Sequence, residues 1–156
     1  MRVLGIDAGL TCGYALFDAD GTRSAGIYDL REAGEDIGAR LAAFEQWLAT
    51  MIQARAVDLV ALERPFGRAF TVVTPSVIVA VAHMTAHNMG VPRREFTASQ
   101  IKHAMTGNGR AAKGDVQSAL ETRYGFDFRH IRKADQNDAA DAAAVAVLAW
   151  AREQQA

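Results

Sequence analysis

The chain has 156 residues, of which half are hydrophobic and 22% are charged, and its formal net charge is −1. This composition excludes an intrinsically disordered protein, because such chains are poor in apolar residues. The length predicts a single domain over residues 1–156 with a substantial core. No segment approaches the roughly 20 consecutive apolar residues of a membrane-spanning helix, so we expect no membrane partner. The single cysteine, Cys12, and the lack of a signal peptide favour a cytoplasmic protein.

The charges are unevenly distributed along the chain. Residues 1–60 contain nine acids and five arginines, whereas residues 93–133 contain nine bases and four acids. A basic segment facing an acidic centre suits a polyanion held near metal ions. The alternative is an ordinary soluble surface of mixed charge.

The first part of the chain predicts three strands. Residues 2–8 form an apolar strand that ends at an acid, and a second strand is expected over 11–18. Asp20-Gly21 is a strong hairpin signal, and a third strand follows over about 22–30. We therefore expect an antiparallel meander.

In the middle of the chain, the spacing of the apolar residues changes from that of a strand to that of a helix. Residues 34–54 carry apolar side chains at helical spacing, with a core face from Ile37 to Ile52. Residues 57–63 form a short, nearly all-apolar run, which is typical of a central parallel strand. Pro65 and Gly67 then predict a loop over 64–70.

The second half predicts mainly helices. The expected elements are a helix over 75–88, a weak strand over 91–96, a short helix capped by Thr97 or Ser99 and ending at Met105, a basic loop over 107–113, a helix over 114–124 and a last helix beginning near Asp138. This order of strands and helices indicates an α/β layered sheet.

Four acids stand at positions that a shared site would explain. Asp7 and Glu63 each end an apolar strand, and the carboxyl ends of adjacent parallel strands meet at one edge of a sheet. Asp138 and Asp141 are three residues apart, so they share one face of the last helix. Clustered carboxylates repel each other unless a cation lies between them, which predicts a metal site. The alternative is that Asp135, Asn137 or Asp138 caps the helix and Asp141 is solvated.

Other candidate residues have simpler explanations. His83 and His87 are four residues apart, but soft ligands are absent nearby, so we interpret them as ordinary helix residues rather than a zinc site. Asp135 is interpreted as a cap or a solvated side chain, and Cys12 as buried packing in a strand.

Four ordered motifs together resemble a known family. They are Gly5-Ile6-Asp7-Ala8-Gly9, Leu62-Glu63-Arg64-Pro65-Phe66, Gly107-Asn108-Gly109-Arg110-Ala111-Ala112-Lys113 and Asp138-Ala139-Ala140-Asp141-Ala142. The set resembles the RuvC-type Holliday junction resolvases of the ribonuclease H-like superfamily. The resemblance implies an α/β fold with a mixed five-stranded sheet, three strands antiparallel and then two parallel, flanked by helices. Ala8 and the pair Arg64-Pro65 depart from the family's usual residues.

The resemblance also implies roles for individual residues. Four catalytic carboxylates would hold two Mg²⁺ ions per active site, with Mn²⁺ as a substitute, and they fall on Asp7, Glu63, Asp138 and Asp141. The family's basic residues near the scissile phosphate fall on Lys102 and on Lys113, which is also assigned a catalytic role. The junction-probing aromatic falls on Phe66, and Arg68 lies near a basic position. We add Arg110 as a phosphate contact. Each of these could instead be plain surface, and Phe66 could fold back onto the core or a dimer partner.

The expected activity is cleavage of four-way (Holliday) junctions in DNA recombination and repair. Two metal ions would activate water and stabilise the leaving 3′-oxygen, leaving a 5′-phosphate and a 3′-hydroxyl. The expected partners are branched DNA and a second copy of the chain in a homodimer, and a branch-migration motor is left open as a further partner.

Several alternatives remain at this level. They are a phage-type branched-DNA nuclease with relaxed selectivity, an RNA-processing nuclease of the same fold, and a catalytically idle nucleic-acid-binding domain. Gly5-Ile6-Asp7-Ala8-Gly9-Leu10-Thr11 also resembles the first phosphate loop of actin-like ATPases and sugar kinases. That fold needs two domains and a second Gly-rich loop, which disfavours it.

Overall fold

A computed structural model describes residues 1–67 and 69–155, apart from the side chains of residues 69–73. Five strands form one sheet in the order β3-β2-β1-β4-β5. The strands are β1 (Val3–Asp7), β2 (Thr11–Phe17), β3 (Arg23–Asp29), β4 (Leu59–Glu63) and β5 (Arg93–Phe96). The first three pair antiparallel, and β4 and β5 continue the sheet in parallel to β1. The predicted mixed sheet is confirmed.

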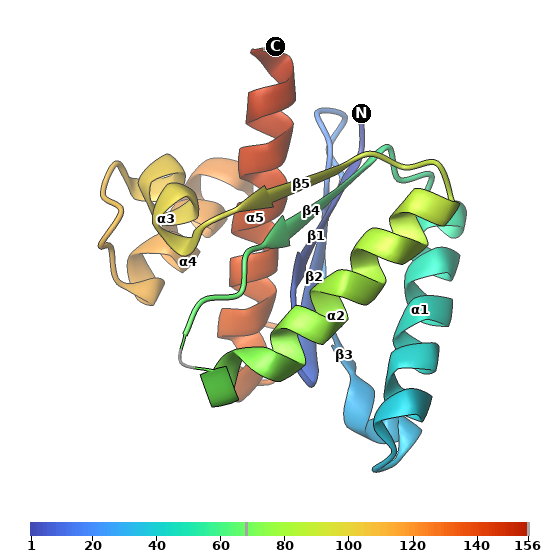
Figure 1. Ribbon diagram of the computed structural model, residues 1–156. Helices are drawn as coiled ribbons and strands as arrows, with labels where there is room; N and C mark the ends of the chain where they lie inside the picture. Colours follow the sequence, from blue (N-terminus) through green and yellow to red (C-terminus); the bar gives the residue numbers. More distant parts are fainter. Residues whose placement is uncertain (68, 156) are drawn as a thin grey trace.

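Five α-helices and two short 3₁₀-helices complete the described ranges of the chain. They are α1 (Ile37–Ala54), α2 (Ala69–Asn88), α3 (Ala98–Thr106), α4 (Lys113–Tyr124), α5 (Gln136–Gln154), η1 (Leu30–Ala33) and η2 (Lys133–Asp135). Helices α1 and α2 lie on one side of the sheet, and α5 lies on the other, with α3 and α4 beside it (Figure 1). No helix in the described ranges is long and apolar enough to span a membrane.

Successive side chains of each strand point to opposite faces of the sheet, and they form two separate hydrophobic cores. Leu4, Ile6 and Leu62 point to the side of α1 and α2, where Phe44 and Leu48 of α1 pack against them. The alternate positions of the same strands point to the α5 side and contribute Val3, Leu59 and Ala61 to the second core. Because side chains alternate with a period of two, the next positions in this second row are Asp7 and Glu63.

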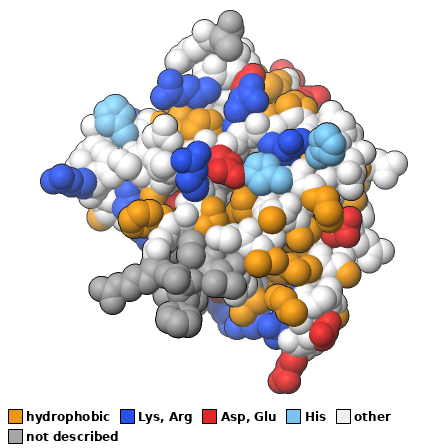
Figure 2. Space-filling view, viewed as in Figure 1, with side chains coloured by type: hydrophobic (Ala, Val, Ile, Leu, Met, Phe, Trp, Pro, Cys, Tyr) orange, Lys and Arg blue, Asp and Glu red, His pale blue; other side chains and the backbone are white. Residues whose placement is uncertain are grey.

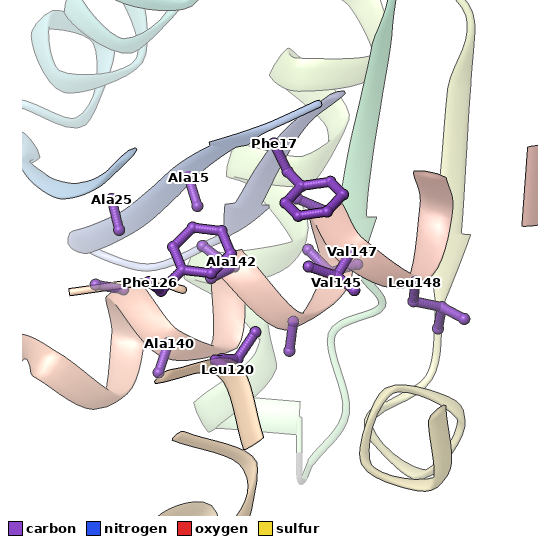
Figure 3. Packing of buried hydrophobic residues seen from close by; sticks show 14 of the residues in the cluster. Ala15, Phe17, Ala25, Leu120, Phe126, Ala140, Ala142, Val145, Val147 and Leu148 are labelled. Atoms are coloured by element: carbon purple, nitrogen blue, oxygen red, sulfur yellow. The ribbon is translucent and has the colours of Figure 1, made fainter. Parts of the chain in front are cut away.

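Helix α5 packs directly on the strand backbones. Its side chains from Ala139 to Ala149 are buried except for that of Asp141, and Figure 3 shows Ala142 and Val145 among aromatic and aliphatic residues of the sheet and of α4. A Cβ at Gly5 would lie 2.1 Å from the carbonyl oxygen of Ala142. Small residues on both surfaces therefore allow an approach that larger side chains would prevent.

The starts of the helices α1, α2 and α5 differ from the sequence prediction. Helix α2 begins at Ala69, six residues before the predicted start, and contains Pro75 in its interior. The prediction placed residues 64–70 in a loop and began the helix at Pro75, but residues 69–74 contain no helix breaker, and the helix runs through them. Helix α1 begins at Ile37 rather than at residue 34, and Ile37 is exposed instead of lying in the core. Helix α5 begins at Gln136, which places Asp138 in its first turn.

Candidate active site

The two strand acids lie side by side because of the sheet register. Ile6 of β1 pairs with Leu62 of β4 in parallel, so the next residues, Asp7 and Glu63, end neighbouring strands. Both acids occupy the row that faces α5. The two side chains line one surface pocket of about 240 Å³ together with Ala8 and Ala98.

The two helix acids reach this edge through a second close contact. Asp7 pairs with Gly13 across β1 and β2, and a Cβ at Gly13 would lie 2.0 Å from the carbonyl oxygen of Asp138. The first turn of α5 therefore rests on the backbone opposite Asp7. Asp141 follows three residues later on the same face of the helix and lines a second pocket of about 120 Å³ with Glu63.

The electrostatics show that the four carboxylates interact. Burial raises the pKa of Asp7 well above its ordinary value of 3.8, and repulsion from Asp141, Glu63 and Asp138, in that order, raises it further. Burial also raises the pKa of Glu63, with Asp141 adding to the effect. The pKa of Asp138 is raised by burial and, less strongly, by Asp141. Negative charge is thus concentrated where solvent compensates it poorly.

Lys113 is the cation in direct contact with this cluster. Its Nζ donates a hydrogen bond of 2.8 Å to Oδ2 of Asp141. Burial lowers the pKa of the Lys113 ammonium, but the hydrogen bond and the nearby charges of Asp141, Asp7 and Asp138 outweigh this effect and raise the pKa overall. Lys113 is also the first residue of α4, where the helix dipole disfavours a positive charge. The contact of Lys113 with the acids compensates for its unfavourable interaction with the helix dipole.

The donor set fits divalent cations. Carboxylate oxygens are the ligands that Mg²⁺ and Mn²⁺ prefer, and the raised pKa values of three acids indicate carboxylates that lack sufficient positive charge. Among residues 1–67 and 69–155, no three acidic, histidine or cysteine side chains are already gathered around one point. The structure therefore places the acids along one edge, with Lys113 paired to Asp141.

The comparisons with known proteins agree with this geometry. Residues 3–149 match the family model described as crossover junction endodeoxyribonuclease RuvC. A protein of that name from Nocardioides sp. is 37% identical over 154 residues, which cover 94% of this chain and 85% of the relative. Another from Gloeobacter violaceus is 33% identical, covering 96% of this chain and 88% of the relative. The chain belongs to the RuvC family of crossover junction endodeoxyribonucleases.

Solved structures agree on the RuvC fold. The structure of Thermus thermophilus RuvC in complex with a Holliday junction substrate matches with a TM-score of 0.80 and 22% identity, covering 99% of this chain and 96% of that one. The yeast mitochondrial Holliday junction resolvase Ydc2 matches with a TM-score of 0.68 and 18% identity, covering 98% and 78%. The predicted family, fold and enzyme class are confirmed. RuvC-family nucleases depend on divalent metal ions.

The structure brings some of the predicted DNA-contacting residues of this RuvC-family chain to the acids. Lys102 lines the smaller pocket with Glu63, Lys113 and Asp141. Phe66 lines the larger pocket, and its side chain is 98% exposed, so it does not fold back onto the core of this chain.

Two other predicted contacts are not brought to the site. Arg110 is exposed in the loop before α4, and the described residues lining the two pockets do not include it. The prediction for Arg68 falls outside the described residues. Asp135, interpreted above as a cap or a solvated residue, forms an ion pair with Arg132 at 2.8 Å.

Sequence reasoning missed Arg64 as a residue of the site. Arg64 lines the larger pocket, and its Nε donates a hydrogen bond of 3.3 Å to Glu95 of β5. Glu95 is also paired with Nε2 of His83 on α2. The available signal was the position of Arg64 directly after Glu63, at a departure from the family's usual residues. No local sequence pattern indicated Glu95 or His83 as neighbours of the site. The contacts of Glu95 with Arg64 and with His83 form only when β5 joins the sheet and α2 packs beside it.

Proposed function

We propose that this RuvC-family nuclease hydrolyses phosphodiester bonds in four-way DNA junctions with Mg²⁺ bound by Asp7, Glu63, Asp138 and Asp141. The observation that carries the proposal is that four carboxylates from β1, β4 and α5 lie along one edge of the sheet, close enough for Asp141, Glu63 and Asp138 to raise the pKa of Asp7. Two ions per site are proposed, with Mn²⁺ as a substitute. When bound, such ions supply an activated water and stabilise charge on the leaving oxygen. The proposed products are a 5′-phosphate and a 3′-hydroxyl.

The chain's own residues would prepare the phosphate for attack. The four carboxylates would balance the charge of the cations and hold them at the strand ends. The Lys113 ammonium lies beside Asp141 and would donate to a phosphate oxygen as negative charge develops there. Lys102, on α3, also lines the smaller pocket and would hold a neighbouring phosphate.

The exposed ring of Phe66 would supply structure selectivity. A base freed from its stack at the branch point can stack on this ring, whereas a base within a linear duplex must first be unstacked. Arg110, which lines neither of the two pockets, and Arg68 are kept as proposed phosphate contacts. An RNA-processing or less selective branched-DNA nuclease would use the same acids, so substrate comparison distinguishes these alternatives.

We also propose that the protein acts as a homodimer, because a four-way junction presents two symmetry-related strands, one for the active site of each copy. Hydrophobic side chains gather over the region of α2 in Figure 2. Val77, Val81 and Met84 follow helical spacing along α2, and the first and last are exposed. This apolar stripe supports α2 as the contact surface between two copies. Met84→Glu should yield monomers by sedimentation, and an unchanged dimer would contradict the role of α2.

The decisive experiment compares matched four-way, Y-shaped and linear DNA in Mg²⁺ and in chelator. We expect preferred cleavage of the four-way junction that disappears in chelator. Asp7→Asn should abolish cleavage but keep junction binding. Asp20→Asn is a matched control, because Asp20 is exposed in the hairpin at the opposite end of β2. Cleavage by Asp7→Asn at the rate of the wild type would overturn the assignment of the acids.

A further inference from the structure

We propose that Arg64 binds a DNA phosphate next to the scissile one, and that Glu95 and His83 hold its guanidinium in the orientation that this contact requires. The inference rests on the proposed function, because it assumes that the scissile phosphate lies at the four acids. It adds one substrate-binding residue and two positioning residues, one of which lies on α2.

The sheet register brings Arg64 and Glu95 to the same face. Leu62 of β4 pairs in parallel with Glu95 of β5, so the two side chains point the same way, and Leu62 points towards α1 and α2. The backbone N–H of Arg64 donates to the carbonyl of Phe96 at 2.8 Å, which continues the pairing of β4 with β5 beyond the end of β4. Because side chains alternate with a period of two, Arg64 follows Leu62 on the face of Glu95.

The three charged side chains form a chain of contacts that ends on α2. Nε of Arg64 donates to Oε2 of Glu95 at 3.3 Å, and Oε1 of Glu95 is paired with Nε2 of His83. Burial raises the pKa of Glu95, but the contacts with His83 and Arg64 outweigh burial and lower it overall. Glu95 is therefore a carboxylate at neutral pH, fixed by α2 on one side and bonded to Arg64 on the other.

This arrangement orients the guanidinium for a phosphate. The bond to Glu95 uses Nε, whereas the two terminal nitrogens can donate the parallel hydrogen bonds with which arginine binds phosphate. The Arg64 side chain is 61% exposed and lines the larger pocket with Asp7 and Glu63. A phosphate beside the acids can therefore reach the guanidinium while Glu95 holds it.

Arg64 also supplies a cation to a pocket that the lysines do not line. Lys102 and Lys113 line the smaller pocket, and the described residues of the larger pocket include Arg64 but neither lysine. Each nucleotide of a DNA strand carries one negative charge, so a strand that crosses the acids brings further phosphates to both sides of the scissile one. The two pockets together can then neutralise successive phosphates.

The test locates the bound phosphate with single, uncharged methylphosphonate linkages at successive positions around the cleavage site of a four-way junction. Binding is measured in chelator, so that the DNA stays intact. At the contacted position, the uncharged linkage should weaken binding to the wild type about tenfold, the loss expected for one charge-assisted contact. Arg64→Gln should weaken binding of the unmodified junction by a similar factor and lower the salt dependence by about one phosphate. At that position only, the two losses should not multiply, because both changes remove the same contact.

Glu95 is tested by the sign of its effect. By charge alone, the removal of an acid should strengthen binding to DNA. If Glu95 positions Arg64, Glu95→Ala should instead weaken binding roughly 2- to 10-fold, the loss expected when a long side chain must be immobilised on binding, and it should reduce the coupling to the phosphate. Glu95→Gln keeps an oxygen that can accept from Nε, so it should restore part of both. His83→Ala should act in the same direction and more weakly, because His83 acts through Glu95.

Glu153→Gln is the matched control. Glu153 of α5 forms an ion pair of 2.9 Å with Arg94, the residue before Glu95 on β5. The variant also removes an acid and an ion pair of β5, but on the side of α5, so it should keep the full coupling between Arg64 and the phosphate. Thermal melting verifies that each variant folds.

Two outcomes would overturn the inference. If the losses multiply at every position, Arg64 contacts no phosphate. If Glu95→Ala binds the junction as tightly as the wild type or more tightly, Glu95 does not position Arg64. Should Glu95→Ala not fold, coupling of the wild-type size in both Glu95→Gln and His83→Ala would refute the positioning role.

These measurements are independent of cleavage, so they separate the inference from the proposed function. If the wild type cuts junctions in Mg²⁺ but shows no coupling, the nuclease proposal stands and the role of Arg64 is wrong. If the coupling is found but no junction is cut, the proposed metal chemistry has failed and Arg64 remains a junction contact.

Discussion

Gly13→Ala should separate the acids without removing any of them. The new Cβ would lie 2.0 Å from the carbonyl oxygen of Asp138, whereas real Cβ contacts essentially never fall below 3.0 Å. The first turn of α5 must therefore retreat from β2 by about 1 Å. Overpacking of this kind costs about 1–3 kcal/mol of unfolding free energy. Because a displacement of about 1 Å at a catalytic site can cost ~100-fold in rate, we expect cleavage to fall by about that factor.

The assay combines stability and single-turnover cleavage of a four-way junction. At ~2–4 °C for each kcal/mol in a chain of this size, the melting temperature should fall by roughly 2–12 °C. Cleavage is measured well below that temperature, so that unfolded protein does not contribute. The expected signature is a rate loss greater than the folded fraction explains, with junction binding retained.

Gly114→Ala is the matched control. Gly114 lies in α4, and a Cβ there would meet no atom within 4 Å. Alanine in a helix is favoured over glycine by about 0.5–1 kcal/mol, so this variant should melt slightly higher and cut normally. If Gly13→Ala melts and cuts like the wild type, close packing at Gly13 does not set the position of Asp138, and the reasoning fails.

Three further predictions follow from the same site. The raised pKa values of Asp7, Glu63 and Asp138 mean that the metal-free folded state binds more protons than the unfolded state above the ordinary aspartate pKa of 3.8. The unfolding free energy of the metal-free protein should therefore fall as the pH rises towards neutrality, and Mg²⁺ should reverse this loss. Denaturant titration in chelator at several pH values measures the unfolding free energy, and an increase with pH would contradict the prediction. Lys113→Met should slow cleavage by about 10²–10³-fold while junction affinity, measured by gel shift, stays near that of the wild type. A matching loss of affinity would make Lys113 a binding residue only. Phe66→Ala should slow junction cleavage by roughly 5- to 150-fold and leave linear-duplex binding unchanged, whereas an unaltered junction rate would remove Phe66 from the mechanism.

The sequence predicted the sheet because its strands obey local rules. Three signals depend only on residues that are neighbours in the chain: the alternation of apolar and polar residues, the hairpin signal Asp20-Gly21 and the short apolar run over 57–63. The same rules placed Asp7 and Glu63 at strand ends, where parallel pairing brings them together. Spacing alone put Asp138 and Asp141 on one helix face. Local signals failed at the start of α2, which was predicted at Pro75 and lies at Ala69.

The pocket lined by Arg64, Phe66, Ser99 and Gly109 could not be predicted from local patterns. Its walls come from the segment after β4, the start of α3 and the loop before α4. The contact of Gly109 with Ser99, and that of Arg64 with Glu95, join residues that no periodicity relates.

The sequence by itself determined the antiparallel meander of the first three strands and the helix faces, and it predicted which four acids form the proposed metal site. Only the tertiary structure decided that α5 lies on Gly5 and Gly13, and that Lys113 contacts Asp141. The reason is physical. Backbone hydrogen bonding and side-chain periodicity act over a few residues, whereas the depth at which a helix rests on a sheet depends on small residues that are distant in the chain and meet only after folding.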